Sequence, residues 1–168
     1  MNPERFIVFE TDYGWIGIVS SHIGVKSLYL PRVSRCEIED EVGRRYGSLQ
    51  FDSIMFQDLK HRLIRYFRGE AVQFNDPVDL TDGTVFSRLV WEVVKVIPWG
   101  QLRTYKQIAE SISKPRSARA VGQALNANPV PIIIPCHRVI GSDGSLTGFA
   151  SGLDLKQKML LSEGHGLQ

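Results

Sequence analysis

The stretch Pro131–Gly144, PIIIPCHRVIGSDG, poses the central question of this chain because it places Cys136 directly before His137. An apolar triplet fenced by two prolines precedes the pair, and we expect it to be buried. A cysteine in this setting has three readings: a nucleophile, a metal ligand, or a small apolar residue in a core. The rest of the sequence has to decide between them.

Length and composition describe an ordinary globular chain. It has 168 residues, of which 43% are hydrophobic and 23% charged, so extensive disorder is not expected. No apolar run reaches the length of a membrane span, and the start, MNPERF, lacks the apolar segment of a signal peptide. We therefore expect no membrane association and a cytoplasmic location, or a nuclear one in a eukaryote.

Cysteine and histidine usage argues against a disulfide framework and against a metal site. The two cysteines, Cys36 and Cys136, lie far apart in the sequence, which fits a reducing compartment and leaves Cys136 able to react. A zinc site needs about four ligands, commonly in close pairs. The other candidates, His22, His61 and His165, are scattered. We expect no metal and no cofactor.

Local patterns predict an α+β fold with two domains, residues 1–80 and 84–168. The first thirty residues alternate like the strands of a small β-sheet, and a weak helix is expected near 37–46. A better helix is expected to start at Ser53 and to end at Gly69. Residues 70–83 lack any period and are expected to link the domains.

The second domain is predicted to be mostly helical. Thr84 begins an apolar stripe that ends at the Pro-Trp-Gly of residues 98–100, and Thr104 can cap the next helix. Lys114-Pro115-Arg116 breaks that helix, and Ser117 can cap a third helix that ends at Leu125. Helix, short break and helix outline a helix-turn-helix, although an ordinary helical hairpin has the same outline. A last helix is expected over residues 153–163.

Basic residues concentrate around the predicted helix-turn-helix. Between residues 95 and 119 a single acid, Glu110, faces six basic residues: Lys95, Arg103, Lys106, Lys114, Arg116 and Arg119. This excess is typical of a surface that follows a phosphate backbone, but a solvated basic face would look the same.

As a nucleophile, Cys136 would need a base nearby. Side chains of adjacent residues diverge, so a water molecule between Cys136 and His137 is one way to join them. Glu163, at the end of the last predicted helix, is a candidate for orienting the imidazole. Spacing alone leaves this open.

The segment Pro135-Cys136-His137-Arg138-Val139 resembles the active-site signature of the O6-alkylguanine-DNA alkyltransferases, which repair alkylated guanine in DNA. The resemblance covers about residues 84–164, whereas residues 1–80 carry no diagnostic motif. Further matches follow the order and approximate spacing of the family: Ile97-Pro98-Trp99-Gly100, Thr104-Tyr105, Ile108-Ala109, Arg119-Ala120-Val121-Gly122, Asn128-Pro129 and Glu163-Gly164.

The resemblance implies a set of catalytic residues. Cys136 would be the acceptor of the alkyl group, His137 would activate it through a water molecule, and Glu163 would orient the histidine. Asn128 would brace the turn between the helix-turn-helix and the active-site strand. Tyr105 would help to neutralise the departing guanine and would contact the DNA backbone.

The resemblance also implies double-stranded DNA containing O6-alkylguanine as the partner, bound through its minor groove. Arg119 would take the place of the extruded nucleotide, and the small residues around it would let the helix approach closely. We expect a monomer and leave cooperative assembly on DNA open. The implied DNA-binding residues are Tyr105, Lys106, Lys114, Ala118, Arg119, Ala120, Gly122 and Ser142.

A pocket for the alkylated base is expected around the Cys-His stretch. Pro131, Val139 and Phe149 would be its apolar walls, and backbone N–H groups of Ala150 or Ser151 would bind guanine O6. Some relatives have tyrosine at the position of Phe149, so a hydroxyl is lost here while the stacking face is kept.

The expected activity is that of a methylated-DNA–[protein]-cysteine S-methyltransferase, a suicide enzyme. A thioether on Cys136 offers no carbonyl to water, so each molecule should react once. Residues 1–80 would serve as a scaffold, and residues 84–168 would bind DNA and carry the active site. Two alternatives stay open: a DNA-binding module that transfers nothing, and a cysteine hydrolase or acyltransferase that regenerates its thiol.

Overall fold

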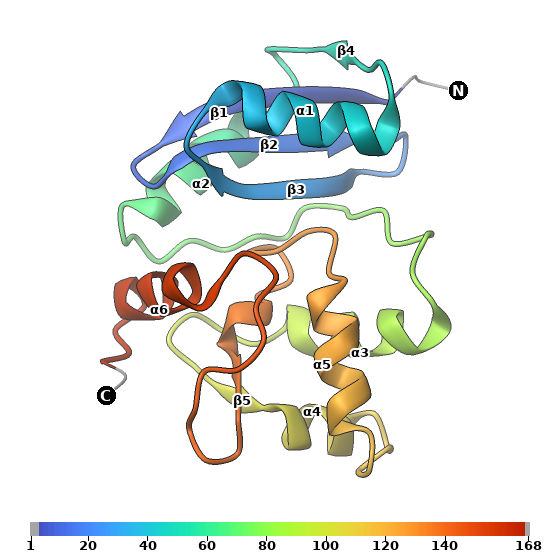
Figure 1. The fold of residues 1–168 in the computed structure, drawn as a ribbon, viewed down its shortest axis with the longest axis vertical. Helices are drawn as coiled ribbons and strands as arrows, with labels where there is room; N and C mark the ends of the chain where they lie inside the picture. Colours follow the sequence, from blue (N-terminus) through green and yellow to red (C-terminus); the bar gives the residue numbers. More distant parts are fainter. Residues whose placement is uncertain (1–3, 167–168) are drawn as a thin grey trace. The chain divides into compact units, whose positions relative to one another are not determined.

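The structure is a computed structural model that describes residues 4–166. It divides into two compact units, Met1–Leu80 (unit 1) and Thr81–Gln168 (unit 2), and each is described by itself (Figure 1). A small sheet with helices in unit 1 and mostly helices in unit 2 confirm the α+β class. No helix within residues 4–166 has the length and apolar character needed to cross a membrane.

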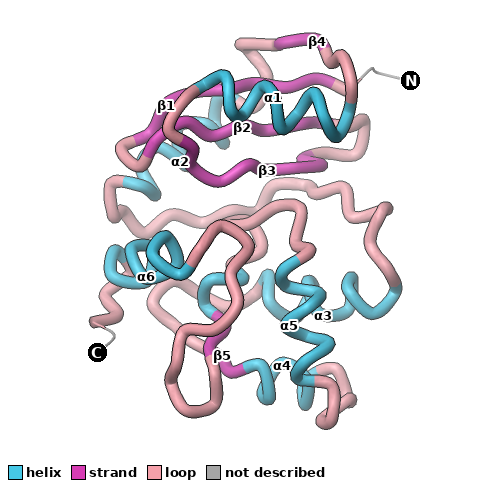
Figure 2. The backbone as a smooth tube through the Cα atoms, viewed as in Figure 1, coloured by secondary structure: helices cyan, strands magenta, loops and turns pink. Residues whose placement is uncertain are grey.

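Unit 1 is built around the predicted β meander. The sheet order is β3-β2-β1-β4 (Figure 2). The first three strands pair antiparallel, and β4 pairs parallel with β1. The elements are β1 (Arg5–Thr11), β2 (Gly14–Ser20), β3 (Val25–Arg32), α1 (Arg35–Tyr46), β4 (Gln50–Phe51) and α2 (Gln57–Phe67).

Helix α1 packs on one face of this sheet through apolar side chains. Val8 and Val19 of the strands form a buried cluster with Ile38 and Val42 of the helix. Gly17 makes this close approach possible, because a Cβ atom there would lie 2.5 Å from the Ile38 side chain. Alternation along the strands buries a second apolar set on the opposite face.

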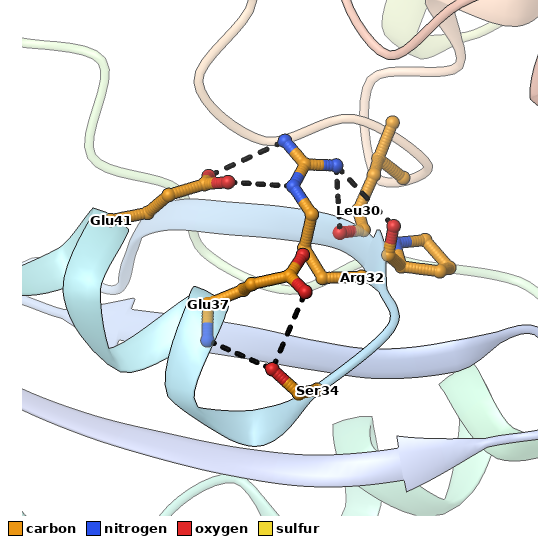
Figure 3. Close-up of polar contacts among 6 residues, drawn as sticks. Leu30, Arg32, Ser34, Glu37 and Glu41 are labelled. Atoms are coloured by element: carbon orange, nitrogen blue, oxygen red, sulfur yellow. Dashed lines mark hydrogen bonds and ion pairs between the residues drawn. The ribbon is translucent and has the colours of Figure 1, made fainter.

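The start of α1 is held by polar contacts from the preceding strand and turn (Figure 3). The Ser34 hydroxyl accepts a hydrogen bond from the Glu37 N–H at 3.3 Å and so caps the helix. The Arg32 guanidinium, at the end of β3, donates to Glu41 from Nε at 2.6 Å. Strand and helix are thereby joined at one corner of the unit.

Helix α2 begins at Gln57, so the expected start at Ser53 is wrong. The Asp52 carboxylate accepts hydrogen bonds from the backbone N–H groups of Ile54 and Met55, which closes a turn before the helix. Phe56 then adopts a left-handed backbone with φ of 53°, and helical geometry starts after it. The helix ends at Phe67 with Arg68 as its C-cap, and Gly69, with φ of 81°, follows in the left-handed conformation.

Most of the expected linker belongs to unit 1. Val78 forms a parallel bridge with Val25 of β3, and the Val25 N–H donates to the Pro77 carbonyl at 2.9 Å. Gly24 permits this contact, since a Cβ atom there would lie 2.2 Å from the Pro77 oxygen. The segment up to Leu80 is therefore tied to the sheet.

Unit 2 is a cluster of helices with one very short sheet. Helices α3, α4 and α5 pack on one another, and the Trp91 indole N–H of α3 donates to the Ala124 carbonyl of α5 at 2.8 Å. The elements are α3 (Val85–Lys95), β5 (Arg103–Thr104), α4 (Tyr105–Ser111), α5 (Ala118–Asn126), the 3-10 turn η1 (Cys136–Arg138), β6 (Val139–Ile140) and α6 (Leu153–Ser162).

The helix-turn-helix outline is present as α4, a turn and α5. Thr104 and Gln107 form a reciprocal capping box at the start of α4, and Thr84 caps α3. Ser117 precedes α5, but its side chain makes no capping hydrogen bond, so that expectation is wrong. Its backbone, with φ of −101° and ψ of 19°, is not in the extended form that a side-chain cap uses.

Candidate functional site

The two-residue pairing of β5 with β6 brings the Cys-His stretch beside the start of α4. Arg103 pairs with Val139 and Thr104 with Ile140 in parallel register. Cys136 lies three residues before the first pair, and Tyr105 directly after the second. Cys136 itself sits in the 3-10 turn η1 and not on the strand that the resemblance implied, because the Arg138 N–H donates to the Pro135 carbonyl at 2.9 Å and the Val139 N–H to the Cys136 carbonyl.

His137 and Glu163 meet inside unit 2. The His137 Nε2 atom lies 2.8 Å from Glu163 Oε1, and both side chains are fully buried. Glu163 follows α6 as its C-cap, so the end of this helix folds back onto the Cys-His turn. Burial by itself would raise the pKa of Glu163, but hydrogen bonds from His137 and Arg138 bring it down to about 2. Glu163 is therefore a carboxylate at neutral pH.

The proton state of His137 follows from the same contacts. Burial lowers the pKa of His137, the hydrogen bond to Glu163 acts against this, and the Arg138 and Lys156 charges add to the lowering. A neutral imidazole beside an ionised carboxylate donates its Nε2 proton to that carboxylate. The Nδ1 atom then carries the lone pair of the ring, and His137 is a base.

Cys136 is a buried thiol that needs such a base. Burial raises the pKa of the Cys136 thiol, while a hydrogen bond from Asn128 and the charge of Lys156 act in the opposite direction. The thiol is therefore protonated at neutral pH, and a nucleophilic thiolate requires proton transfer to an acceptor. His137 is adjacent in the sequence and is in the protonation state that can accept.

Asn128 holds the loop that leads into the Cys-His turn. Its Nδ2 donates to the Ile134 carbonyl at 2.8 Å, and its Oδ1 accepts from the Val130 N–H at 3.0 Å. Within this loop the buried Ile132 has a φ of 75°, which is strained for a β-branched residue. The two Asn128 hydrogen bonds close the loop on both sides of this strained residue.

Lys156 forms a second polar centre next to the turn. This lysine of α6 is fully buried, and its ammonium donates to the Val139 carbonyl at 2.6 Å and to the Thr147 carbonyl at 3.2 Å. Burial lowers its pKa to about 8. The Tyr105 hydroxyl lies 3.5 Å from Lys156 Nζ and donates to the Thr147 carbonyl at 2.8 Å. Helix α4, strand β6 and the following loop are joined at this lysine.

Comparisons with known proteins decide the family. The family model "6-O-methylguanine DNA methyltransferase, DNA binding domain" matches residues 85–165. A methylated-DNA–protein-cysteine methyltransferase of Methanosarcina acetivorans is 39% identical over 95% of this chain and 97% of its own length. The chain belongs to the methylated-DNA–protein-cysteine methyltransferase family. The resemblance read from the sequence is thus confirmed.

Further members of the family are similar to this chain in sequence or in structure. The Methanosarcina barkeri protein of the same name is 51% identical over 67% of this chain and 71% of its own. A crystal structure of the Mycobacterium tuberculosis protein in complex with DNA is 34% identical and has a TM-score of 0.79, covering 95% of this chain and 92% of that one. The likeness to that structure therefore includes both units.

The residues expected to bind DNA lie along α4 and α5, in the turn between these helices and in the loop after β6. Lys106, Lys114, Arg119 and Ser142 are exposed, and Ala118, Ala120 and Gly122 are half-buried. Gly122 lies against the Tyr105 ring, where an added Cβ atom would be 3.7 Å from Cε1. A Cβ atom at this distance would make an ordinary van der Waals contact, so the packing of α4 on α5 does not itself require glycine here.

The residues expected to line the pocket fall into two groups. Pro131 and Val139 are buried, and the Val139 carbonyl accepts from Lys156. Phe149 and Ser151 are half-buried and Ala150 is exposed, in the loop before α6. Among residues 4–166 no group of three or more His, Cys, Asp or Glu side chains is placed to hold a metal ion.

The sequence did not predict the positions of two residues of the site, Arg138 and Lys156. Arg138 belongs to the signature segment, but nothing in the sequence indicated that it holds both oxygens of Glu163, at 2.8 and 2.9 Å. Lys156 was passed over because a lysine in an amphipathic helix normally faces solvent. The neighbouring Leu155 is only half-buried, and Lys156 occupies the interior beside it.

Proposed function

We propose that this chain repairs DNA by moving an alkyl group from O6-alkylguanine in double-stranded DNA to the Sγ atom of Cys136. The observation that carries the proposal is the buried hydrogen bond between Glu163 and His137, the residue that follows Cys136. The chain that contains it belongs to this family. That arrangement supplies a thiol, a neutral base and a carboxylate that stabilises the base once it is protonated.

The transfer step balances with these groups alone. His137 accepts the thiol proton through a water molecule, and the thiolate sulfur attacks the alkyl carbon. The S–C bond forms as the bond between this carbon and guanine O6 breaks, and its electron pair goes to the guanine. The Glu163 carboxylate stabilises the imidazolium formed on His137. The product is a thioether that water does not cleave, so each molecule reacts once.

The guanine has to leave the base stack before the thiol can reach it. Arg119 on the exposed side of α5 would fill the vacancy, and the small residues of α5 would let the helix enter the minor groove. Tyr105 would donate a proton or hydrogen bond to the departing base. Since its hydroxyl now donates to the Thr147 carbonyl, it has to exchange this partner for the guanine.

The remaining assignments complete the proposal. Asn128 braces the loop, and Lys106, Lys114 and Ser142 contact the DNA backbone. Pro131, Val139 and Phe149 form the pocket walls, with the backbone of Ala150 or Ser151 holding guanine O6. Unit 1 acts as a scaffold, and the protein works as a monomer in the cytoplasm, or in the nucleus of a eukaryote.

Mass spectrometry of the intact protein and its peptides tests the proposal after mixing with a duplex that contains O6-methylguanine. We expect one methyl group per chain, located on Cys136 and absent in Cys136→Ser. The matched control is Cys36→Ser, which removes the exposed thiol and should transfer normally. Tight lesion binding without an adduct would instead favour a recognition module. A regenerated thiol with repeated turnover would favour a hydrolase.

A further inference from the structure

Arg138 follows the Cys-His pair and takes no part in the transfer step. Its side chain is buried, with Nε donating to Glu163 Oε2 at 2.8 Å and Nη2 donating to Oε1 at 2.9 Å. Its Nη1 donates to the Ile97 carbonyl at 2.6 Å. The guanidinium is therefore locked on three sides, and it shares Glu163 Oε1 with His137.

The charges in this buried cluster have to compensate one another, because solvent does not reach them. The exposed fractions of the His137, Arg138 and Glu163 side chains are 0%, 7% and 0%. An arginine stays protonated in proteins, so Arg138 and the Glu163 carboxylate cancel as a pair. A proton added to His137 would then place a second positive charge beside the Glu163 carboxylate, which the Arg138 guanidinium already neutralises.

Removing the Arg138 charge would favour the protonated form of His137 over the neutral form. Glu163 would keep its negative charge in a buried position next to His137, but without the arginine cation. A buried charge without a counter-ion is costly, so the imidazole would take up a proton to pair with it. A histidine that already holds a proton cannot accept another from the thiol.

We propose that Arg138 is a positioning residue that keeps His137 neutral, with its proton on Nε2, so that the other ring nitrogen can accept the proton of Cys136. The benefit for alkyl transfer rests on the proposed function. The effect on the proton state of His137 does not depend on it.

The other titratable groups around His137 are Glu163 and Lys156 from α6 and Cys136 from η1. Burial and the Lys156 charge lower the pKa of His137 together with Arg138, and Glu163 opposes them. Lys156 lies on the opposite polar centre, bonded to Val139 and Thr147, and makes no ion pair with Glu163 among the described contacts. Arg138 is thus the cation that acts directly on the carboxylate shared with His137.

Ring-nitrogen NMR of full-length protein tests the proton state without DNA. In the wild type we expect His137 to be neutral and Nε2-protonated at neutral pH, and to take up its second proton at lower pH than in the urea-unfolded chain. In Arg138→Met this protonation should move to higher pH. Arg138→Lys keeps a positive charge but loses the paired hydrogen bonds to the two Glu163 oxygens. In this variant the pH of protonation should lie between those of wild type and Arg138→Met. A wild-type His137 that is already protonated at neutral pH would overturn the proposal, as would an Arg138→Met titration identical to wild type.

Single-turnover methyl transfer at saturating DNA tests the consequence for the reaction. For Arg138→Met we expect the ratio of the rate at about pH 8.5 to that at about pH 6 to rise by about tenfold over wild type. A purely structural role would lower the rate by the same factor at every pH and would contradict us. Arg62→Met is the matched control, since Arg62 holds both oxygens of Asp76 in unit 1, at 2.9 and 2.7 Å.

Two safeguards keep the outcomes separate. If Arg138→Met fails to fold, the wild-type and Arg138→Lys titrations still decide the proton state. If the wild type transfers no methyl group, the proposed function fails, whereas the NMR titration continues to test Arg138.

Discussion

The two units of this chain bury different kinds of side chain. Beneath α1, unit 1 buries the apolar cluster of Val8, Val19, Ile38 and Val42, and ion pairs such as Arg32–Glu41 stay partly exposed. Among residues 4–166, unit 2 buries four basic or acidic side chains, His137, Arg138, Lys156 and Glu163, whereas unit 1 buries one, Asp79. Truncating one member of an apolar cluster costs stability according to the cavity it leaves, whereas removing one member of a buried ion pair leaves an uncompensated charge. Single substitutions should therefore act differently in the two units.

The largest expected difference is between two carboxylates that each hold an arginine. Glu163→Gln leaves Arg138 buried without its counter-ion and should lower the free energy of unfolding by about 3–5 kcal/mol. Asp76→Asn breaks the partly exposed pair with Arg62 and should cost about 1 kcal/mol. Urea unfolding at neutral pH measures both. Equal losses would show that burial does not distinguish the two units.

The dependence of stability on acid pH should report on the same carboxylate, Glu163. The pKa of Glu163 is about 2 in the folded chain against an ordinary value of 4.5, so the unfolded chain takes up the proton first as the pH falls. The stabilisation is complete above about pH 4.5 and is lost as the pH falls toward about 2. Glu163→Gln should lack this part of the acid dependence. A variant curve parallel to wild type over that range would contradict the assignment.

Lys156 should make the free energy of unfolding depend on pH in the alkaline range. Its pKa is about 8 when folded against 10.5 ordinarily, so between these values the unfolded chain binds more protons and stability rises with pH. Comparing wild type with Lys156→Met isolates this contribution, which should be roughly 3 kcal/mol across the window. Lys158→Met, a change of an exposed lysine on the same helix, is the control and should leave the alkaline dependence unchanged.

A smaller effect is expected from Asn128, whose side chain is neutral. Asn128→Ala removes the bonds to Val130 and Ile134, and should cost about 1–2 kcal/mol. Because these bonds hold the strained Ile132 just before the Cys-His turn, methyl transfer should slow as well. The nearby Asn126→Ala changes an exposed residue at the end of α5 and should affect neither quantity. Amide exchange of residues 128–138 locates the loosened segment.

The elements that could be read from the sequence are those set by local chemistry. Thr84 and Thr104 cap helices where the pattern placed them, and the buried triplet before Cys136 lies where its apolar run predicted. The start of α2 was missed because Phe56 adopts a left-handed backbone that its residue type does not signal. Family resemblance pointed to Cys136, His137 and Glu163, which periodicity alone could not bring together.

The buried charges could not be read in the same way. Lys156 is interior because β5–β6 pairing and the following loop present the Val139 and Thr147 carbonyls to it, and these partners come from distant parts of unit 2. The fork of Arg138 on Glu163 likewise joins residues 25 positions apart. Charged residues are normally assigned to the surface, so only the three-dimensional contacts identify the exceptions.

The smallest effect should come from the cap of α1 in unit 1. Ser34→Ala removes the hydrogen bond to the Glu37 N–H at an exposed site and should lower stability by about 1 kcal/mol or less. Amide exchange should increase in the first turn of α1, while the rate of methyl transfer stays at the wild-type value. Ser34→Asp restores an acceptor at the cap and should recover the loss. A slower transfer in Ser34→Ala would mean that unit 1 acts on the reaction, and it would end the division between an apolar scaffold and a charged site.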